Sequence, residues 1–185
     1  MGNNPSEFKG EKRPVENVSW YDAVKFCQKL SQKTGKTYHL LSEAQWEYAC
    51  RAGTTSPFYF GDTIRQDLVN YDPNYSYGSG GSTPKGVYRQ QTTDVRCFPP
   101  NAFGLYDMHG NVWEWCAWHA NYQGALSEGR VWDYINNDNS YQMLRGGSWF
   151  NKPRNCRSAI RFYRPPDHSN GAFGFRVVCV AAWVP

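Results

Sequence analysis

The sequence predicts an α+β domain that has two helices, short antiparallel strands and much irregular loop. Only two segments, within residues 19–35 and 42–53, show the three- and four-residue apolar spacing of a helix face. Short apolar segments typical of strands lie at Tyr38–Leu41, Met143–Trp149 and Phe173–Ala182. Long stretches such as Tyr71–Pro84 and Asn121–Tyr141 have no helical period, and their embedded aromatic residues indicate packed, ordered loops.

Each predicted helix has a start and a stop signal. The first begins after Ser19, which suits an N-cap, and Gly35 follows it as a stop. Its apolar residues fall on one face: Trp20, Ala23, Val24, Cys27 and Leu30. The second begins at Ser42, with Gln45 at the spacing of a capping box, and ends at Gly53. Its inward residues are Trp46, Ala49 and Cys50.

Length and composition restrict the class of protein. A chain of 185 residues corresponds to one domain, and an aromatic content of 17% argues against intrinsic disorder. The longest apolar run, Val177–Val184, is far shorter than the ~20 residues that a membrane helix needs. Since no signal peptide is visible, we expect a cytoplasmic protein without membrane insertion. Display of the protein on a cell surface through a missing segment is the alternative.

The six cysteines form no CxxC pair, which argues against a zinc site or a redox motif. We expect small buried thiols in a reducing compartment, and one or two disulfides are the alternative.

Five motifs occur in order along the chain. They are PVENVSWYDAVKFC (Pro14–Cys27), LLSEAQWEYACRAG (Leu40–Gly53), NAFGLYDMHGNVWEW (Asn101–Trp115), LRGGSW (Leu144–Trp149) and GFRVVC (Gly174–Cys179). Together they resemble the formylglycine-generating-enzyme (sulfatase-modifying factor) superfamily. The resemblance implies one domain over residues 1–185 with a variant of the C-type lectin fold. It also implies a strand-bearing segment before Met1, so we expect this first strand to be missing.

The resemblance does not extend to the catalytic cysteines. Oxidase members of the superfamily bind copper with two cysteines in a GGSxxCxxxxC pattern. This chain has Asn151 at the first position and Cys156 at the second, and a carboxamide is not a soft thiolate ligand. Its histidines are scattered. Related enzymes bind iron partly through a separate helical domain, which we expect to be missing here. We therefore expect neither copper nor iron and no enzymatic activity; a formylglycine-generating-type oxidase or related metal-dependent enzyme is the alternative.

The segment Leu144–Val178 holds seven basic residues and one acidic residue, so it carries +6 while the rest of the chain carries −2. It resembles the variable region of diversity-generating-retroelement target proteins, in which a fixed framework surrounds replaceable positions. The resemblance implies that ten positions are diversified and bind ligand: Phe150, Lys152, Ile160, Phe162, Tyr163, Arg164, His168, Ser169, Gly171 and Ala172. Asn151, Asn155 and Asn170 then correspond to template residues left unchanged.

The predicted function is therefore non-catalytic binding of a protein or other macromolecule by this diversified surface. The alternative for these positions is a core role, above all for Phe150 and Ile160, and Trp149 is expected in the core. Nucleic-acid binding is a weaker hypothesis, because Arg145, Arg157 and Arg176 lie in framework motifs and are expected to pair internally with acidic residues. A structural or regulatory domain of a larger protein is a third possibility.

The resemblance also implies a calcium site in DMHGNVWE. Asp107 and Glu114 would supply carboxylates, and Gly110 and Val112 would supply backbone carbonyls, which are the oxygen ligands that Ca²⁺ prefers. The alternative is that both carboxylates accept backbone amides in a tight turn.

Overall fold

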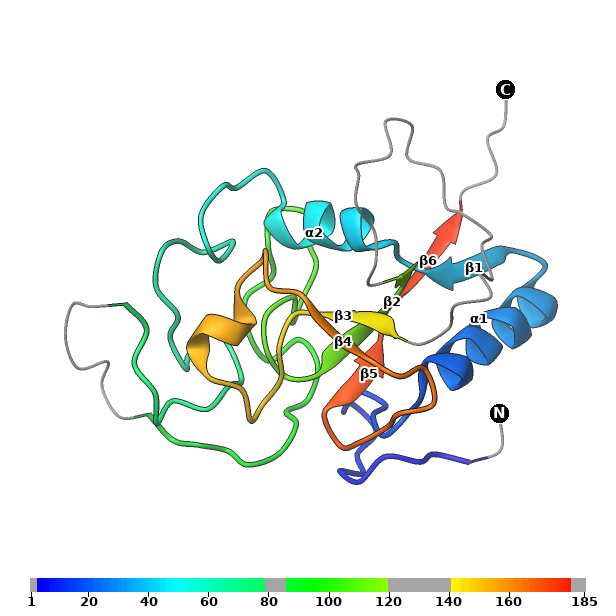
Figure 1. Ribbon diagram of the computed structural model, residues 1–185, viewed down its shortest axis with the longest axis horizontal. Helices are drawn as coiled ribbons and strands as arrows, with labels where there is room; N and C mark the ends of the chain where they lie inside the picture. Colours follow the sequence, from blue (N-terminus) through cyan, green and yellow to red (C-terminus); the bar gives the residue numbers. More distant parts are fainter. Residues whose placement is uncertain (1–2, 79–85, 120–140, 181–185) are drawn as a thin grey trace.

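The computed structural model describes residues 3–78, 86–119 and 141–180 (Figure 1). Within these ranges the elements are two helices, six strands and one 3₁₀ turn. In chain order they are α1 (Trp20–Thr34), β1 (Thr37–Leu40), α2 (Glu43–Arg51), β2 (Trp113–His119), β3 (Gln142–Arg145), η1 (Pro153–Cys156), β4 (Phe162–Arg164), β5 (Phe173–Phe175) and β6 (Val177–Val180). The predicted α+β class is confirmed.

Helix α1 begins and ends where the sequence predicts. The Ser19 hydroxyl accepts the backbone N–H of Asp22 at 3.1 Å, and the Asp22 carboxylate accepts the backbone N–H of Ser19 at 3.1 Å. This reciprocal pair satisfies amides that the first turn leaves without partners. The helix ends at Gly35, whose φ of 70° is the left-handed conformation that glycine adopts without strain.

Helix α2 has the predicted capping box but a different end. The Ser42 hydroxyl accepts the backbone N–H of Gln45 at 3.2 Å, and the Gln45 side chain accepts the backbone N–H of Ser42 at 2.9 Å. The predicted end at Gly53 is wrong by one position. Ala52 adopts the left-handed conformation, with φ 45°, and donates its backbone N–H to the carbonyl oxygen of Tyr48.

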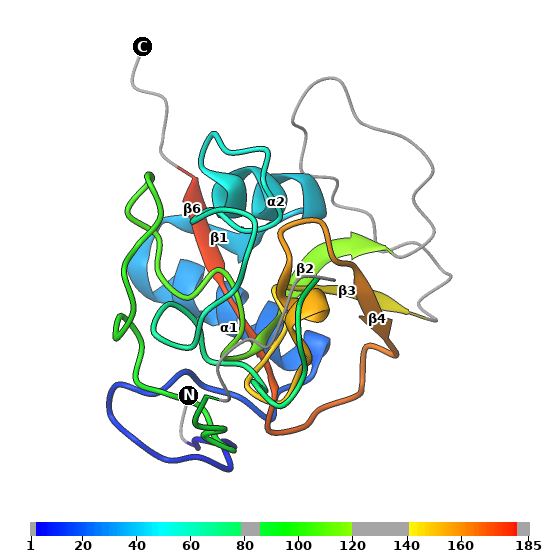
Figure 2. The same ribbon diagram turned by 90° about the vertical axis from the view of Figure 1, so that its left-hand side faces the viewer.

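The strands form two small sheets (Figures 1 and 2). One has the order β4-β3-β2-β5, and the other pairs β1 with β6. The strand pairs are antiparallel except β2 with β5, which is parallel. The single strand predicted over Phe173–Ala182 is wrong, because β5 joins the first sheet whereas β6 joins the second. Strand β4 was also missed, because residues 160–173 mix bulky apolar side chains with Pro, Gly and Arg, which is typical of a surface loop.

Aromatic residues of the sheet form the centre of the core. Trp113 and Trp115 from β2, Leu144 from β3 and Phe173 from β5 pack with Cys27 from α1. A second cluster under α2 contains Trp46, Cys50, Met108, Cys116 and Met143. Burial of each large apolar side chain contributes about 2 kcal/mol. The C-terminal segment is therefore built directly onto the core.

The irregular segments are ordered where the structure describes them. Tyr71 is buried in a third cluster with Phe58, Ile64, Val69 and Cys156. The predicted loop Tyr71–Pro84 is described as far as Gly78, and the predicted loop Asn121–Tyr141 lies outside the described residues except for Tyr141. All six cysteines are free, and four are buried; Cys97 and Cys179 are exposed. Neither helix in the described ranges combines the length and apolarity that a bilayer crossing needs.

Candidate functional site

A tight turn at Gly146–Ser148 carries the start of the predicted binding segment. Gly147 has φ 80°, and a Cβ there would lie 2.7 Å from the Cys156 Sγ, so only glycine lets η1 pack this closely. The Ser148 hydroxyl donates to the Asn151 side-chain oxygen, and the Asn151 carbonyl oxygen accepts the backbone N–H of Asp72 at 3.0 Å. These bonds fix the direction in which residues 149–152 leave the core.

The thiol of Cys156, which stands at the position of the second family cysteine, is not reactive in this arrangement. Cys156 is fully buried, and burial raises the pKa of its thiol to about 12. Its backbone carbonyl oxygen binds the Nδ1 of His109 at 2.7 Å, and the His109 Nε2 accepts the backbone N–H of Tyr59. Burial lowers the pKa of His109 to about 4. With Asn151 at the other position, two thiolates cannot meet here.

Aromatic side chains gather around Trp149. Its ring centroid lies 5.6 Å from Phe8, 5.3 Å from Phe150 and 6.3 Å from Tyr88. The Lys152 ammonium lies 4.1 Å from the centroid of Tyr75. We call this group the aromatic patch: Phe8, Tyr75, Tyr88, Trp149, Phe150 and Lys152. Trp149 is half-buried rather than in the core as predicted, and Phe150 is 41% exposed.

Sequence reasoning missed Phe8, Tyr75 and Tyr88. They lie 61 or more positions before Trp149 in the chain, and no local pattern links them to it. The overall excess of aromatic residues was the single available signal.

Strand β4 holds a second group of the predicted residues. Tyr163 is 52% exposed, and its ring meets Tyr141 edge-on at 5.4 Å. Phe162 is half-buried because it stacks on Trp113 at 4.9 Å, and the Arg164 guanidinium lies 4.1 Å from its centroid. Ile160 is likewise half-buried against the core. The alternative of a core role thus applies in part to Ile160 and Phe162.

The remaining predicted residues lie in the loop 165–172. His168 and Ser169 are exposed, and Gly171 is half-buried. Ala172 is 1% exposed, so the prediction that it presents a side chain to ligand is wrong. Its carbonyl oxygen accepts the backbone N–H of Trp113 at 2.7 Å, which holds it in the core.

Framework bonds connect these groups. The Trp149 indole N–H donates to the Gly171 carbonyl oxygen at 3.0 Å, and the ring of Phe173 contacts those of Phe162 and His168. We call the accessible predicted residues the display surface: Phe150, Lys152, Ile160, Phe162, Tyr163, Arg164, His168, Ser169 and Gly171. Backbone bonds from Asn17 to Asn170 and from Trp20 to Pro166 fix its loop to the N-terminal part of the chain.

Three of the seven basic residues in the segment are neutralised by acids elsewhere. Arg145 pairs with Glu43 and Glu47 at 2.7 and 2.6 Å, and Arg161 also pairs with Glu43. Arg176 pairs with Glu114 at 2.8 Å. Arg157 was also expected to pair with an acid, but it has no acidic partner among the described residues, and its Nε donates to the Arg154 carbonyl oxygen.

Four basic residues have no ion-pair partner in the described part of the chain: Lys152, Arg154, Arg157 and Arg164. Lys152 and Arg164 belong to the display surface, which contains no acidic residue, so this surface has a positive bias.

The residues of the calcium motif do not fit a calcium cage. Both carboxylate oxygens of Glu114 bind the Arg176 guanidinium, at 2.8 and 3.0 Å, and one also accepts the Trp46 indole N–H. A cation bound there would face a guanidinium at hydrogen-bond distance. Asp107 accepts the backbone N–H of Arg96 at 2.9 Å, which agrees with the alternative of backbone-amide pairing. No cluster of three or more His, Cys, Asp or Glu side chains occurs in the described ranges.

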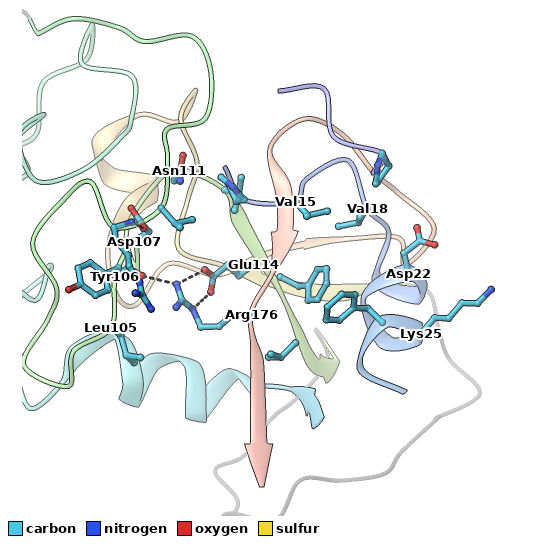
Figure 3. A pocket seen from close by; sticks show the side chains of 18 of the residues that line it. Val15, Val18, Asp22, Lys25, Leu105, Tyr106, Asp107, Asn111, Glu114 and Arg176 are labelled. Carbon is cyan, nitrogen blue, oxygen red and sulfur yellow. Dashed lines mark hydrogen bonds and ion pairs between the residues drawn. The ribbon is translucent and has the colours of Figure 1, made fainter. Parts of the chain in front are cut away.

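A groove of about 800 Å³ lies beside this ion pair (Figure 3). Figure 3 shows Tyr106 and Asp107 on one side, Val15, Val18 and Lys25 on the other, and the Glu114–Arg176 pair between them. Burial raises the pKa of Asp107, because its carboxylate is largely shielded from water. No residue of the display surface lines this groove.

The two capped helices, the small mixed sheet and the GGSW turn define an α+β scaffold whose loops and strand β4 carry the candidate surface. The chain belongs to the family of the sulfatase-modifying factor enzyme 1-like domain, whose profile matches residues 1–181.

Curated relatives include active and inactive members. The chain is 30% identical to the chaperone protein LppX of Paenibacillus barcinonensis, over 80% of this chain and 63% of LppX. It is 31% identical to the formylglycine-generating enzyme of Mus musculus, over 93% of this chain and 45% of the enzyme. It is also 31% identical to the inactive C-alpha-formylglycine-generating enzyme 2 of Bos taurus, over 93% of this chain and 52% of that protein. The chain thus spans about half to two thirds of these relatives.

Solved structures agree with the fold. PvdO from Pseudomonas aeruginosa superimposes with a TM-score of 0.75 at 37% identity, over 93% of this chain and 64% of PvdO. Treponema denticola variable protein 1 superimposes with a TM-score of 0.74 at 28% identity, over 97% of this chain and 78% of that protein.

Proposed function

We propose that this chain is a non-catalytic ligand-binding protein, and that its display surface contacts a protein or another macromolecule. The observation that carries the proposal is the exposure of Phe150 and Tyr163 on backbone that is fixed to the core. Large aromatic side chains on rigid backbone are typical of binding hot spots, because they bury much area and lose little entropy.

Burial separates framework from replaceable positions in the segment 144–178. Arg145 and Ser148 are fully buried and hydrogen-bonded, so substitution there would leave buried polar partners unsatisfied. Lys152, Tyr163 and His168 are exposed, and substitutions at exposed positions usually change stability by less than about 0.5 kcal/mol. This division favours a surface that varies while the fold persists.

Asn170 has a framework role, which supports the proposal that it stays unchanged while its neighbours vary. Its side-chain oxygen accepts the backbone N–H of Ala172 at 2.9 Å, and its carbonyl oxygen accepts the backbone N–H of Asn17 at 3.0 Å. Asn151 likewise holds the turn before η1. Replacement of either residue would release the loop that it anchors.

The comparisons support the same proposal. One structural neighbour is a variable protein, and one relative is an inactive member of the formylglycine-generating family. The buried Cys156 and the carboxamide of Asn151 support the absence of oxidase activity. The residues of the proposed calcium site offer no support for a calcium-dependent ligand.

A display library tests the proposal. Phe150, Lys152, Tyr163, His168 and Ser169 are randomised together and selected against a defined globular protein. A matched control library randomises exposed residues at the far end of α1 and after it: Gln28, Gln32, Lys33 and Lys36. We expect the first library to yield folded binders and the control library to yield folded proteins that do not bind. Equal enrichment from both libraries would contradict the proposal.

The enzymatic alternative has its own test. The purified chain is incubated with copper and a sulfatase-type CxPxR peptide, and the peptide mass is followed. We expect no formylglycine to form. Conversion of the peptide cysteine would contradict the non-catalytic proposal.

A further inference from the structure

The groove beside the Glu114–Arg176 pair is apolar along most of its length. Val15 and Val18 line it from the N-terminal segment, Phe26 from α1, and Phe175 and Val177 from the two C-terminal strands. Val15 is 45% exposed, although valine is usually buried. A concave apolar surface of this kind is typical of a binding site.

At Phe175, Arg176 and Val177 the groove reaches the start of a strand edge that lacks a partner in the described part of the chain. Strand β6 pairs with β1 along one edge, and no described strand pairs with its other edge. The neighbouring β5 is covered at Gly174, where a Cβ would lie 2.8 Å from the Val15 carbonyl oxygen. The open edge therefore begins after Gly174. It leaves the groove at Val177 and continues along β6 for about 13 Å, the length of four extended residues. Such an edge is a template for an added strand.

Polar groups of the groove suit peptide groups. The Oδ1 of Asp107 is buried and has no donor among the described residues. Arg176 keeps 25% of its side chain exposed although it pairs with Glu114. A peptide backbone offers both an N–H donor for Asp107 and a carbonyl acceptor for Arg176, whereas an apolar small molecule offers neither.

The charges on the rim favour a foreign strand over a second copy of the chain. Three exposed cations line the groove, Lys25 and Lys29 from α1 and Arg96, against one exposed acid, Asp22. A symmetric pair of copies meeting here would bring the same lysines together, and like charges at close distance are unfavourable. A partner with acidic residues beside its apolar strand would instead be attracted.

We propose that this groove binds an extended apolar segment of a partner protein, flanked by acidic residues, which adds as a strand to the free edge of β6. This site is separate from the display surface, so its failure would leave the proposed function unchanged.

Fluorescence anisotropy of a labelled peptide tests the proposal. The probe is a nine-residue peptide that alternates valine and threonine and has a glutamate at each end. A control peptide has proline in place of two central residues and cannot donate the ladder bonds. We expect saturable binding of the probe, slower amide exchange in β6 on binding, and no binding of the control. No binding of the probe, or equal binding of both peptides, would overturn the proposal.

Matched variants locate the binding. Val15→Glu changes an exposed side chain of the groove. It should lower the affinity for the probe peptide at least about tenfold, which corresponds to about 1.4 kcal/mol. Val87→Glu makes the same change at a valine that is 71% exposed and lies outside both the groove and the display surface, and it should leave the affinity unchanged. Equal affinity for Val15→Glu and the wild type would place the peptide elsewhere and overturn the proposal.

Two other occupants are outcomes of the same experiment. Sedimentation equilibrium that reveals a dimer abolished by Val15→Glu would assign the groove to a second copy. Asn3 and Pro5 also line the groove. If a longer product of the gene no longer bound the probe, the groove would be filled by the protein's own chain. Either result would overturn the proposal that the groove binds a strand of a partner protein.

Discussion

The indole N–H of Trp149 donates to the carbonyl oxygen of Gly171 across 3.0 Å, and this bond joins two loops that lie 22 residues apart in the chain. The GGSW turn fixes one end of it, and backbone bonds from Asn17 and Trp20 fix the other. The display surface thus owes its shape to framework residues and not to the side chains that it exposes.

Trp149→Phe tests this connection. The variant keeps an aromatic ring but loses the donor, so we expect a loss of about 1–2 kcal/mol in the free energy of unfolding. Amide exchange within residues 165–172 should become faster. Phe150→Ala is the control, because the side chain is partly exposed and no framework bond depends on it. Equal losses in both variants would contradict the role given to Trp149.

Arg145 should be among the costliest residues to replace. Its guanidinium is fully buried between Glu43 and Glu47, and its Nη2 also donates to the Ser158 carbonyl oxygen at 2.7 Å. Arg145→Met removes these charge-assisted bonds and leaves the buried Ser158 carbonyl oxygen without its donor, while Glu43 keeps Arg161 and Glu47 keeps Arg51. We therefore expect the free energy of unfolding to fall by about 2–3 kcal/mol. Chemical denaturation measures this loss.

Arg161→Met is the matched control for that experiment. Arg161 pairs with the same Glu43 at 2.6 Å, but 44% of its side chain is exposed. We expect its replacement to cost less than about 1 kcal/mol. A loss as large as that of Arg145→Met would show that burial does not set the difference.

His109 should make stability depend on pH. Burial lowers its pKa from 6.5 to about 4, so the unfolded chain takes up the proton at a higher pH than the folded chain. The contribution of His109 to stability should therefore fall by about 3 kcal/mol as the pH falls from about 6.5 to about 4, and this contribution should not change further below that range. Denaturation at several pH values measures the slope.

The comparison of two histidine variants isolates this effect from other titrating groups. His109→Gln should remove the slope, whereas His168→Gln changes an exposed residue and should keep it. Identical slopes in His109→Gln and the wild type would assign the pH dependence to other groups.

Thiol labelling should separate the six cysteines into two groups. Cys97 and Cys179 are exposed, whereas burial raises the pKa of Cys27 to about 11 and of Cys50 to about 12. The thiolate is the reactive form, so mass spectrometry after iodoacetamide treatment should find two labels on the native protein and six after unfolding. A label on native Cys156 would contradict the buried position found for it.

Calcium should not stabilise the protein. Arg176 already neutralises Glu114, so we expect excess calcium chloride or a chelator to leave the melting temperature unchanged. A rise in melting temperature with calcium that Asp107→Asn abolishes would instead support the site implied by the family resemblance.

Local chemistry made the helices predictable from the sequence. Ser19 and Ser42 cap their helices through side chains within three residues, so the signal and the structure coincide. The division of residues 173–180 between two sheets was not predictable, because β5 pairs with β2 and β6 with β1, both distant in the chain.

The candidate surface was predictable only in part, because it too depends on contacts between residues that are distant in the chain. The exposure of Tyr163 and His168 follows from their polar sequence neighbours. The burial of Ala172 depends on its bond to Trp113, and the aromatic patch depends on contacts of Trp149 with Phe8 and Tyr88. The ion pair between Arg176 and Glu114 likewise depends on a tertiary contact, and it occupies a carboxylate that was expected to bind a metal ion.

Sequencing of this gene and its surrounding DNA in many separate isolates tests the central claim most directly. We predict a neighbouring reverse-transcriptase gene and a near-copy of the last part of the gene. Substitutions should be confined to codons of exposed residues such as Lys152, Tyr163 and His168. Codons of Arg145, Ser148 and Asn170 should remain constant. Substitutions spread evenly over exposed positions of the whole chain, with no near-copy, would contradict a dedicated variable surface.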